Sequence, residues 1–230
     1  MAGPPLFRPS AIPTGLQGFW KLDETSGNRV DSSGNGNTLV DNNTVLFAAF
    51  NYWNTDNSAD FESSNSEYLS ITDGLQTGLD VSSAFTISAW VKRESQVTNM
   101  SIASKWGASG QRSYMLEVPD DGSIELRRST DGTASVSLVT ATGIIALNKW
   151  HHVVGKYDGS FLSIYLDGNL VASSVVTGTV FNSTAIFILG AFDNGAPPVN
   201  PYDGLIKDVA IWNTALTSIQ IKSLALGIEL

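Results

Sequence analysis

Six Asp-Gly pairs are spread along this chain, and they constrain its fold more than any other feature. The pairs begin at residues 73, 121, 131, 158, 167 and 203. An Asp-Gly pair between two alternating runs indicates a β-hairpin, because the tight turn needs residues that tolerate positive φ. Apolar and polar residues alternate in FTISAWV over 85–91 and in FLSIYL over 161–166. Strands at this density, without a long helical period, predict an all-β sandwich or barrel.

The ends of the chain differ from this pattern. Residues 16–230 contain no linker or internal repeat, so we expect one domain there. We expect one short helix near the end of the chain. Thr217 and Gln220 have the spacing of a capping box that would begin this helix, and Gly227 can terminate it. Residues 1–15 contain four prolines, which exclude a helix and favour an extended arm. We expect this arm to dock on other protein subunits, or on its own domain.

The amino-acid composition limits the kinds of partner and site that this chain can have. The chain has 22 acidic and 13 basic residues, a net charge of -9, and so lacks the basic footprint that nucleic-acid binding needs. It has no cysteine, which excludes disulfides and thiolate metal sites. Its apolar runs are too short for membrane insertion. The N-terminus lacks the apolar region of a signal peptide, so we expect assembly in a cytoplasm or prior removal of a signal.

Several segments resemble laminin-G-like (LamG, concanavalin A-like) domains, and they occur in the order of that family. They are GFWKLDE at 18–24, DSSGNGN at 31–37, FTISAWVK at 85–92, KWHHVVGKYDG at 149–159, IYLDG at 164–168 and GLIKDVAIWNTAL at 204–216. The resemblance covers about residues 16–222. It implies an antiparallel two-sheet jelly-roll sandwich, a fold that hosts lectins, adhesion modules, hydrolases and virion proteins.

The DSSGNGN loop offers oxygen ligands at alternate positions. These come from Asp31, Ser33, Asn35 and Asn37, and oxygen is the ligand that Ca²⁺ prefers. An EF-hand is excluded, because its twelfth position is Asn42 where a bidentate Glu is needed. The same residues are also common in turns that bind no metal, so a plain turn is the alternative interpretation.

The family resemblance implies which further residue would complete the ligands of a calcium ion. Laminin-G-like domains often carry a structural calcium near the first loop, with an acid from the closing strand beside it. That acid would be Asp208 in this chain. Lys207 stands where the family usually has another acid, which weakens the match, and Glu24 could compensate.

Aromatic residues in polar context suggest a sugar-binding platform. Tyr52, Trp53, Trp106 and Tyr202 are the candidates, because sugars stack on exposed aromatic rings beside amide and acid groups. For Trp53 and Trp106, a core position or a subunit contact explains the residue equally well. The other four tryptophans lie in the strands that resemble the family, and we expect them in the core.

No catalytic constellation is evident. The chain has no G-x-S-x-G motif for a nucleophile. A glycosidase needs two carboxylates across a cleft, and the acids of Glu117 and Asp121 fall in an apparent turn. His151 and His152 are the only histidines, and neighbours on a strand point to opposite faces. We therefore expect no enzyme, and one histidine buried in the sandwich.

These observations predict a non-enzymatic binding or adhesion protein. One version is a virion (phage) surface decoration or tail-fibre component, docked through the arm and assembled in a host cytoplasm. The alternative is a calcium-stabilised carbohydrate-binding module of a secreted or cell-surface bacterial protein. A glycosidase is a more remote alternative. Binding to glycans and formation of a homo-oligomer are both compatible with the acidic surface.

Overall fold

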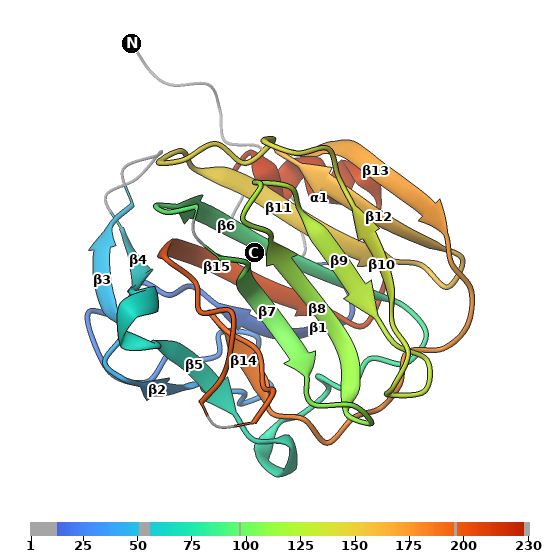
Figure 1. The fold of residues 1–230 in the computed structure, drawn as a ribbon, viewed down its shortest axis with the longest axis horizontal. Coiled ribbons are helices and arrows are strands. Elements are labelled where there is room, and N and C mark those ends of the chain that lie inside the picture. The colour runs from blue at the N-terminus through green and yellow to red at the C-terminus, as the bar shows by residue number, and fades with distance from the viewer. Residues whose placement is uncertain (1–12, 51–55, 97, 196, 228–230) are drawn as a thin grey trace.

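Two antiparallel β-sheets stacked face to face make up most of the molecule (Figure 1). The computed structural model describes residues 13–50, 56–96, 98–195 and 197–227. Within these ranges the chain forms fifteen strands, two short 3-10 helices, η1 (Ser63–Asn65) and η2 (Asp73–Leu75), and one α-helix. The all-β jelly-roll sandwich with a short C-terminal helix is confirmed.

The larger sheet has eight strands, in the order β13-β12-β11-β6-β15-β4-β3, with β1 also paired to β15. Its strands are β1 (Leu16–Trp20), β3 (Leu46–Ala49), β4 (Asn57–Phe61), β6 (Phe85–Arg93), β11 (His151–Tyr157), β12 (Phe161–Leu166), β13 (Asn169–Val175) and β15 (Gly204–Trp212). The first and last strands of the sandwich, β1 and β15, are therefore direct neighbours.

The second sheet has seven strands, in the order β10-β9-β8-β7-β14-β5-β2. Its strands are β2 (Val40–Asn42), β5 (Tyr68–Ile71), β7 (Met100–Trp106), β8 (Arg112–Val118), β9 (Glu125–Arg128), β10 (Val136–Val139) and β14 (Phe187–Leu189).

Four of the six Asp-Gly pairs lie in hairpin turns. They separate β8 from β9, β9 from β10, β11 from β12 and β12 from β13. The last turn has φ of 49° at Asp167 and 79° at Gly168, the two positive angles of a type I′ turn. The hairpin prediction is wrong for the other two pairs. Asp73 begins a 3-10 helix, and Gly204 begins β15, where a Cβ would lie 2.3 Å from the carbonyl oxygen of Lys92.

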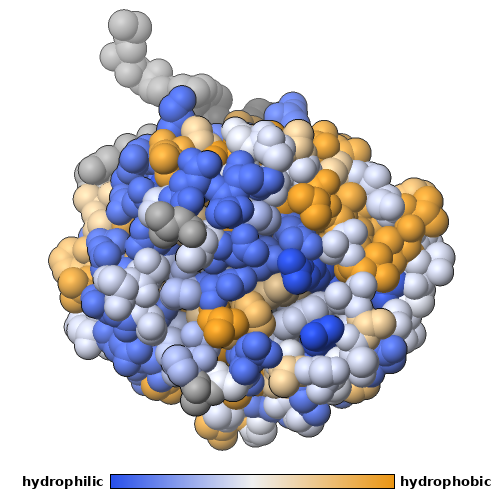
Figure 2. Space-filling view, in the orientation of Figure 1, coloured by the Kyte–Doolittle hydropathy of each residue, from blue (hydrophilic) through white to orange (hydrophobic). Residues whose placement is uncertain are grey.

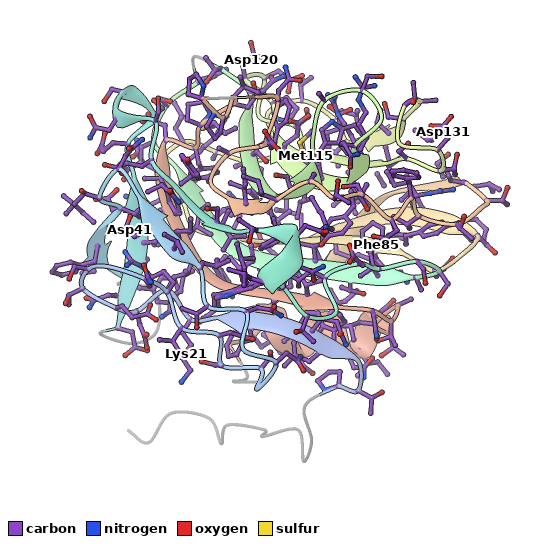
Figure 3. All side chains as sticks on the ribbon, turned by 90° about the horizontal axis from the view of Figure 1, so that it is seen from below. Lys21, Asp41, Phe85, Met115, Asp120 and Asp131 are labelled. Atoms are coloured by element: carbon purple, nitrogen blue, oxygen red, sulfur yellow. The ribbon has the colours of Figure 1, made fainter. Side chains whose placement is uncertain are left out.

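The main core lies between the two sheets. Figure 3 shows the layers from the side, with Phe85 between them and Met115 on the seven-stranded sheet. Trp20 is fully buried there and stacks on Phe187, with ring centroids 5.2 Å apart. Gly155 lies where the sheets approach closely, since a Cβ there would lie 2.7 Å from a methyl carbon of Leu126.

Helix α1 (Ser218–Ala225) covers part of the outer face of the eight-stranded sheet. Its predicted capping box is confirmed, because Thr217 accepts from the Gln220 backbone N–H and Gln220 accepts from that of Thr217. Ile221 and Leu224 pack there with Trp212 in a second, smaller core. In the described part of the chain, no helix is long and apolar enough to cross a membrane.

Candidate binding face of the seven-stranded sheet

The outer face of the seven-stranded sheet carries a group of charged side chains beside the turn between β8 and β9. Along β8, Tyr114, Leu116 and Val118 belong to the main core, so the alternate residues Met115 and Glu117 point outward. The strand register places Glu117 between Ser101 of β7 and Glu125 of β9. It also pairs Met115 with Arg127 of β9. Neighbouring strands thus bring two carboxylates and a guanidinium together on one face.

We name Glu117, Glu125 and Arg127 the acid–arginine cluster. The Nη2 atom of Arg127 lies 2.8 Å from a carboxylate oxygen of Glu117 and 2.8 Å from one of Glu125. The side chain of Glu117 is fully buried, whereas that of Arg127 is 31% exposed. A ligand at this face would therefore meet the guanidinium first and the carboxylates behind it.

The electrostatics of the cluster are governed by burial. Desolvation raises the pKa of Glu117 to about 7, against the opposing effect of Arg127, and nearby Glu125 raises it further. The two carboxylates share one guanidinium, so protonation of Glu117 relieves the repulsion between them. At neutral pH, Glu117 can donate or accept a proton in a hydrogen bond.

The chain segment that leads into β15 borders the cluster. Asn200 donates from its amide nitrogen to Glu117 at 3.5 Å, and its carbonyl accepts from the Ser101 N–H at 3.0 Å. The hydroxyls of Ser101 and Ser113 are buried and have no hydrogen-bond partner among the described residues. Figure 2 shows hydrophilic residues across the middle of this face. Polar groups with unused hydrogen-bonding capacity are thus present beside the cluster.

Sequence reasoning missed this cluster, although a signal was available. The sequence pattern predicts a turn at Glu117, but this residue lies in β8, and the turn begins after Val118. The structure also brings together Glu117 and Glu125 as a pair of carboxylates, which the sequence analysis did not find. Glu117 and Glu125 are each four residues from Asp121, whose Asp-Gly pair closes the hairpin, and this symmetry predicts that they face each other.

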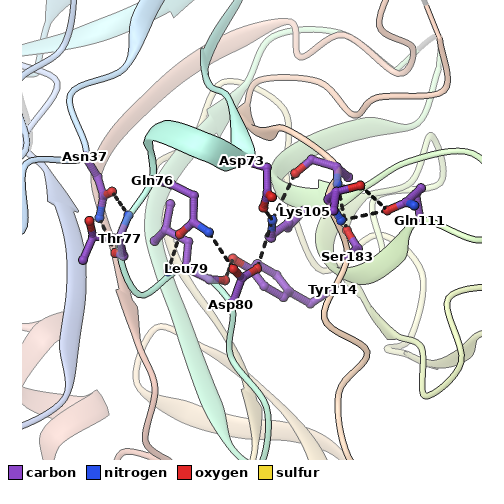
Figure 4. A network of polar contacts seen from close by, with 12 residues as sticks. Asn37, Asp73, Gln76, Thr77, Leu79, Asp80, Lys105, Gln111, Tyr114 and Ser183 are labelled. Atoms are coloured by element: carbon purple, nitrogen blue, oxygen red, sulfur yellow. Dashed lines mark hydrogen bonds and ion pairs between the residues drawn. The ribbon is translucent and has the colours of Figure 1, made fainter.

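A second cation with two carboxylates lies on the inner side of the same sheet, and we name it the lysine cluster. Lys105 of β7 is fully buried, with its Nζ 2.5 Å from Asp73 and 3.0 Å from Asp80 (Figure 4). It also donates to the carbonyl of Ala185 at 3.1 Å. The cluster fastens the segment around η2 to the sheet.

The predicted calcium loop is a network of hydrogen bonds. Asp31 accepts from the backbone N–H groups of Phe19, Ser33 and Asn37 at 2.8–3.0 Å, and from the Ser33 hydroxyl at 2.8 Å. Each carboxylate oxygen therefore already accepts two hydrogens. Asn35 donates from its amide to the carbonyls of Leu16 and Gln17.

Asn37 extends this network to the chain segment that carries the two acids of the lysine cluster. Its amide oxygen accepts from the Thr77 N–H at 2.7 Å, and its amide nitrogen donates to the carbonyls of Gln17 and Thr77 (Figure 4). The loop thus joins β1 to the segment before β6. The family resemblance implied a link from this loop to Asp208 of the closing strand, whereas the hydrogen bonds of the loop run to residues 16–19 and 77.

Asp208 is not brought into this loop. It sits at a bulge of β15 with φ of 50°, and its backbone N–H donates to the carbonyl of Lys21. Burial raises its pKa to about 6, and the charges that act on it come from Lys207, Asp23, Asp56 and Lys21. Over the described ranges, no three His, Asp or Glu side chains lie close enough together to hold a metal ion.

Lys207 provides a cation beside Asp208. Its side chain is only 3% exposed, and its Nζ donates to the carbonyl of Asn57 at 3.0 Å. The same Nζ lies 3.9 Å from carboxylate oxygens of Asp56 and Asp208, and 5.2 Å from the ring centre of Phe50. Glu24, the residue expected to compensate for Lys207, instead lies 3.9 Å from buried Arg29.

The aromatic candidates do not form an exposed platform in the described residues. Trp106 is 4% exposed and Tyr202 is fully buried, with its ring packed edge-on to Phe61. Stacking of a sugar needs an exposed ring face, so the burial of both rings contradicts this role for them. Tyr52 and Trp53 lie outside the described residues.

One histidine is buried as expected, but it lies on the outer face of the eight-stranded sheet and not between the sheets, because its neighbour Val153 is the residue that points into the main core. His152 is buried, and its Nε2 lies 2.8 Å from the Ser88 hydroxyl. Burial lowers its pKa to about 3, so this ring is neutral at physiological pH. Its aromatic neighbour is Trp90, with ring centroids 5.2 Å apart. His151 points to the other side and lies 3.0 Å from Asp167.

Several solved structures share this fold. The binding domain of Paraclostridial Mosquitocidal Protein 1 superposes with a TM-score of 0.71 and 17% identity, over 92% of this chain and 52% of that one. Domain 4 of AbnA, a GH43 extracellular arabinanase from Geobacillus stearothermophilus solved with arabinotriose, gives 0.67 and 23%, over 92% and 98%. A structure of botulinum neurotoxin type C, whose cell entry depends on two ganglioside molecules, gives 0.69 and 15%, over 94% and 52%.

The chain spans about half the length of the two toxin chains and nearly all of the arabinanase domain. At these identities the likeness shows a shared fold. Comparison with curated protein sequences finds no match. The family model of the Concanavalin A-like lectin/glucanases superfamily named Laminin_G_3 matches residues 63–222. With more than half of its length matched and both sheets in place, the chain belongs to this laminin-G-like family.

Proposed function

We propose that this protein is a non-enzymatic binding module that recognises a carbohydrate at the acid–arginine cluster. The observation that carries the proposal is the pair of carboxylates, Glu117 and Glu125, held behind the partly exposed Arg127 on the outer face of the seven-stranded sheet, beside the turn between β8 and β9. Charged groups are costly to place among packed side chains, so their presence there needs a stabilising or a functional reason.

The chemistry of the cluster suits sugar hydroxyls. A guanidinium presents several N–H donors in a fixed plane, and carboxylates accept hydrogen bonds. Adjacent hydroxyls of a sugar can therefore accept from Arg127 and donate to Glu125, whose side chain is 11% exposed, while buried Glu117 supports Arg127 from behind. The buried hydroxyl of Ser101 adds a further polar group next to Glu117. A site of few oriented polar groups is typical of specific small-ligand binding.

Two structural neighbours support a sugar as the ligand. The arabinanase domain was solved in complex with arabinotriose, and the neurotoxin type C study concerns ganglioside molecules. Both resemblances concern the fold alone, so the choice of sugar in this chain rests on its own side chains.

The carboxylate pair also brings back the glycosidase alternative. A raised pKa of about 7 at Glu117 is the property of a general acid, and Glu125 lies beside it. Arg127, however, forms ion pairs with both carboxylates at once. This bridge engages the groups that would have to act on a glycosidic bond, and so favours binding over hydrolysis.

A glycan array followed by calorimetry on the best ligand tests the proposal. Arg127→Gln should abolish binding without unfolding the domain. Lys92→Gln is the matched control, because Lys92 is a partly exposed cation paired to Glu94 at 2.6 Å on the other sheet. An array without any ligand, or equal affinity of both variants, would overturn the proposal. Release of reducing ends from the bound glycan would instead establish the glycosidase alternative.

The role of the protein on a virion remains a further proposal. Its support is the run of four prolines in the arm 1–15, most of which lies outside the described residues. Deletion of residues 2–14 should abolish assembly on a capsid or tail and leave the melting temperature unchanged. Assembly that survives the deletion would leave the cell-surface or secreted alternative.

A further inference from the structure

The ammonium of Lys105 in the lysine cluster contacts three oxygen atoms. Its Nζ lies 2.5 Å from a carboxylate oxygen of Asp73, 3.0 Å from one of Asp80 and 3.1 Å from the carbonyl oxygen of Ala185 (Figure 4). An ammonium has three hydrogens, so these three partners account for all of them. A lysine amine that contacts one carboxyl group and has a second beside it as a base is also arranged for nucleophilic attack.

The two carboxylates of the cluster differ in their other contacts. The second oxygen of Asp80 accepts from the side-chain amide of Gln76 at 2.7 Å, which holds this carboxylate in place beside the amine. Asp73 is the nearer of the two, and among the described residues Lys105 is the only one whose side chain contacts its carboxylate. The geometry therefore suits Asp73 to be the group attacked and Asp80 to be the general base.

The reacting atoms are close enough for attack. A C–O bond of about 1.2 Å places the Cγ carbon of Asp73 within about 3.7 Å of the Lys105 Nζ. Reacting atoms in a productive ground state lie about 3–3.5 Å apart. The fold thus holds the amine and the carboxyl carbon near this geometry without any further movement of the two strands and turns that carry them.

Other lysines in the described part of the chain lack this combination. Lys92 lies 2.6 Å from Glu94, but this pair is partly exposed and has no second carboxylate within 4 Å of the ammonium. Lys207 is almost as buried as Lys105, yet both of its carboxylate partners are 3.9 Å from Nζ. Burial, a close carboxylate and a second carboxylate as base therefore occur together only at Lys105.

We propose that Lys105 and Asp73 condense to an amide bond after the chain has folded, with Asp80 as the catalytic base. Asp80 takes a proton from the ammonium, and the freed electron pair of Nζ attacks Cγ of Asp73. The Nζ–Cγ bond forms and one Cγ–O bond breaks. Two of the three ammonium protons pass through Asp80 to the departing oxygen, which leaves as water. The remaining N–H stays on the amide and donates to the carbonyl of Ala185.

The surroundings of the cluster favour this product. Lys105 is fully buried, which keeps bulk water from the amine, whereas Asp73 and Asp80 are 29% and 31% exposed and leave the released water a way out. A fold that holds two reacting groups in contact gives them an effective concentration of about 10⁵–10⁸ M, which offsets the excess of water. The neutral amide also removes the cost of a buried charge. It would join η2 to β7 covalently.

Mass spectrometry of the full chain tests the proposal. The denatured protein should weigh less than its sequence, with or without Met1, by the mass of one water molecule. Trypsin cuts after Lys and Arg, so it should release residues 30–92 joined to residues 94–112, uncut at Lys105. An intact mass equal to that of the sequence would overturn the proposal.

A cyclic imide at Asp73-Gly74 would also lose one water, and a variant separates the two reactions. Lys105→Met removes the amine and should restore the full mass, whereas the imide would form without the lysine. Thermal melting verifies that this variant is folded. A loss of water that persists in Lys105→Met, or the absence of the branched peptide from the unmodified protein, would overturn the cross-link.

Asp80→Asn tests the base. The side-chain amide has a similar shape but cannot take up the proton, so the cross-linked fraction should fall at least about tenfold in protein isolated at the same time after expression. Asp208→Asn is the matched control, because Asp208 is an acid beside the other buried lysine, and it should leave the fraction unchanged. An equal cross-linked fraction in Asp80→Asn and the unmodified protein would overturn the role of Asp80.

Discussion

The lysine cluster and the acid–arginine cluster each combine one cation with two carboxylates, but they bury opposite charges. In the lysine cluster the cation is fully buried, and its partners Asp73 and Asp80 are 29% and 31% exposed. In the acid–arginine cluster the cation is 31% exposed and its partner Glu117 is fully buried. The first arrangement lets water stabilise the acids and fastens a segment. The second leaves a carboxylate dependent on one guanidinium that a ligand can also reach.

The largest expected effect comes from the buried cation. Lys105→Met removes the ammonium from two carboxylates and a carbonyl, and should lower the free energy of unfolding by about 2–4 kcal/mol. The value lies toward the low end for a broken buried pair, because both acids can be hydrated. Urea unfolding measures it. Lys92→Met, with its exposed partner Glu94, should cost less than about 1 kcal/mol. Equal losses in both variants would remove the distinction between buried and exposed cations.

The next largest effect is expected in the DSSGNGN loop, which Asn37 joins to the segment that carries the acids of the lysine cluster. Asp31→Ala removes an acceptor of four hydrogen bonds, three of them from backbone N–H groups, and should cost about 2–3 kcal/mol. Thermal melting measures the change. We expect a chelator to leave the melting temperature of the unmodified protein within about 2 °C. A larger fall on chelation that Asp31→Ala abolishes would support the calcium prediction for this loop.

The buried carboxylate of the acid–arginine cluster should be visible in the dependence of stability on pH. Because the folded protein holds the pKa of Glu117 above its ordinary value of 4.5, at about 7, its stabilising contribution is complete below pH 4.5. It is lost as the pH rises through 7. Glu117→Gln cannot titrate, so it should be the more stable protein at pH 8, by about 1–3 kcal/mol, with a smaller difference at pH 4.5.

Other groups titrate in the same range, so the comparison uses the difference between the two proteins. Burial also raises the pKa of Asp60 and Asp208 to about 6, which acts in the same direction. His152 acts in the opposite sense, because its pKa is lowered to about 3 and stability falls below pH 6.5. A difference between Glu117→Gln and the unmodified protein that does not vary with pH would contradict the raised pKa.

The smallest effect on stability is expected at the exposed cation. Arg127→Lys keeps the charge and loses the planar group that spans two carboxylates, so the melting temperature should fall by less than about 3 °C. Affinity for the glycan should nevertheless fall about tenfold, measured by calorimetry. If stability fell sharply and affinity did not change, the cluster would be a fastening like that of Lys105.

The sequence predicted the fold well because its signals are local. Capping residues Thr217 and Gln220 and the turn at Asp167 act within a few neighbours, and the spacing of the family-like segments sets the order of strands. The candidate binding face was predictable only in part, because the turn at Asp121 indicates that Glu117 faces Glu125 but does not indicate that Arg127 lies between them. Glu117 and Glu125 meet through strand register, and Tyr202 has a polar neighbour in sequence but is buried against Phe61, far along the chain.

Lys207 has a consequence for the conditions in which the protein can work. Its ammonium is covalently attached and is held by Asn57 beside the carboxylates of Asp56 and Asp208. A free ion stabilises a protein only in proportion to the logarithm of its concentration over its dissociation constant. A tethered cation has no dissociation constant and cannot be diluted away. Its support of the β15 bulge is therefore the same in a dilute medium and in a salt-rich one, apart from screening.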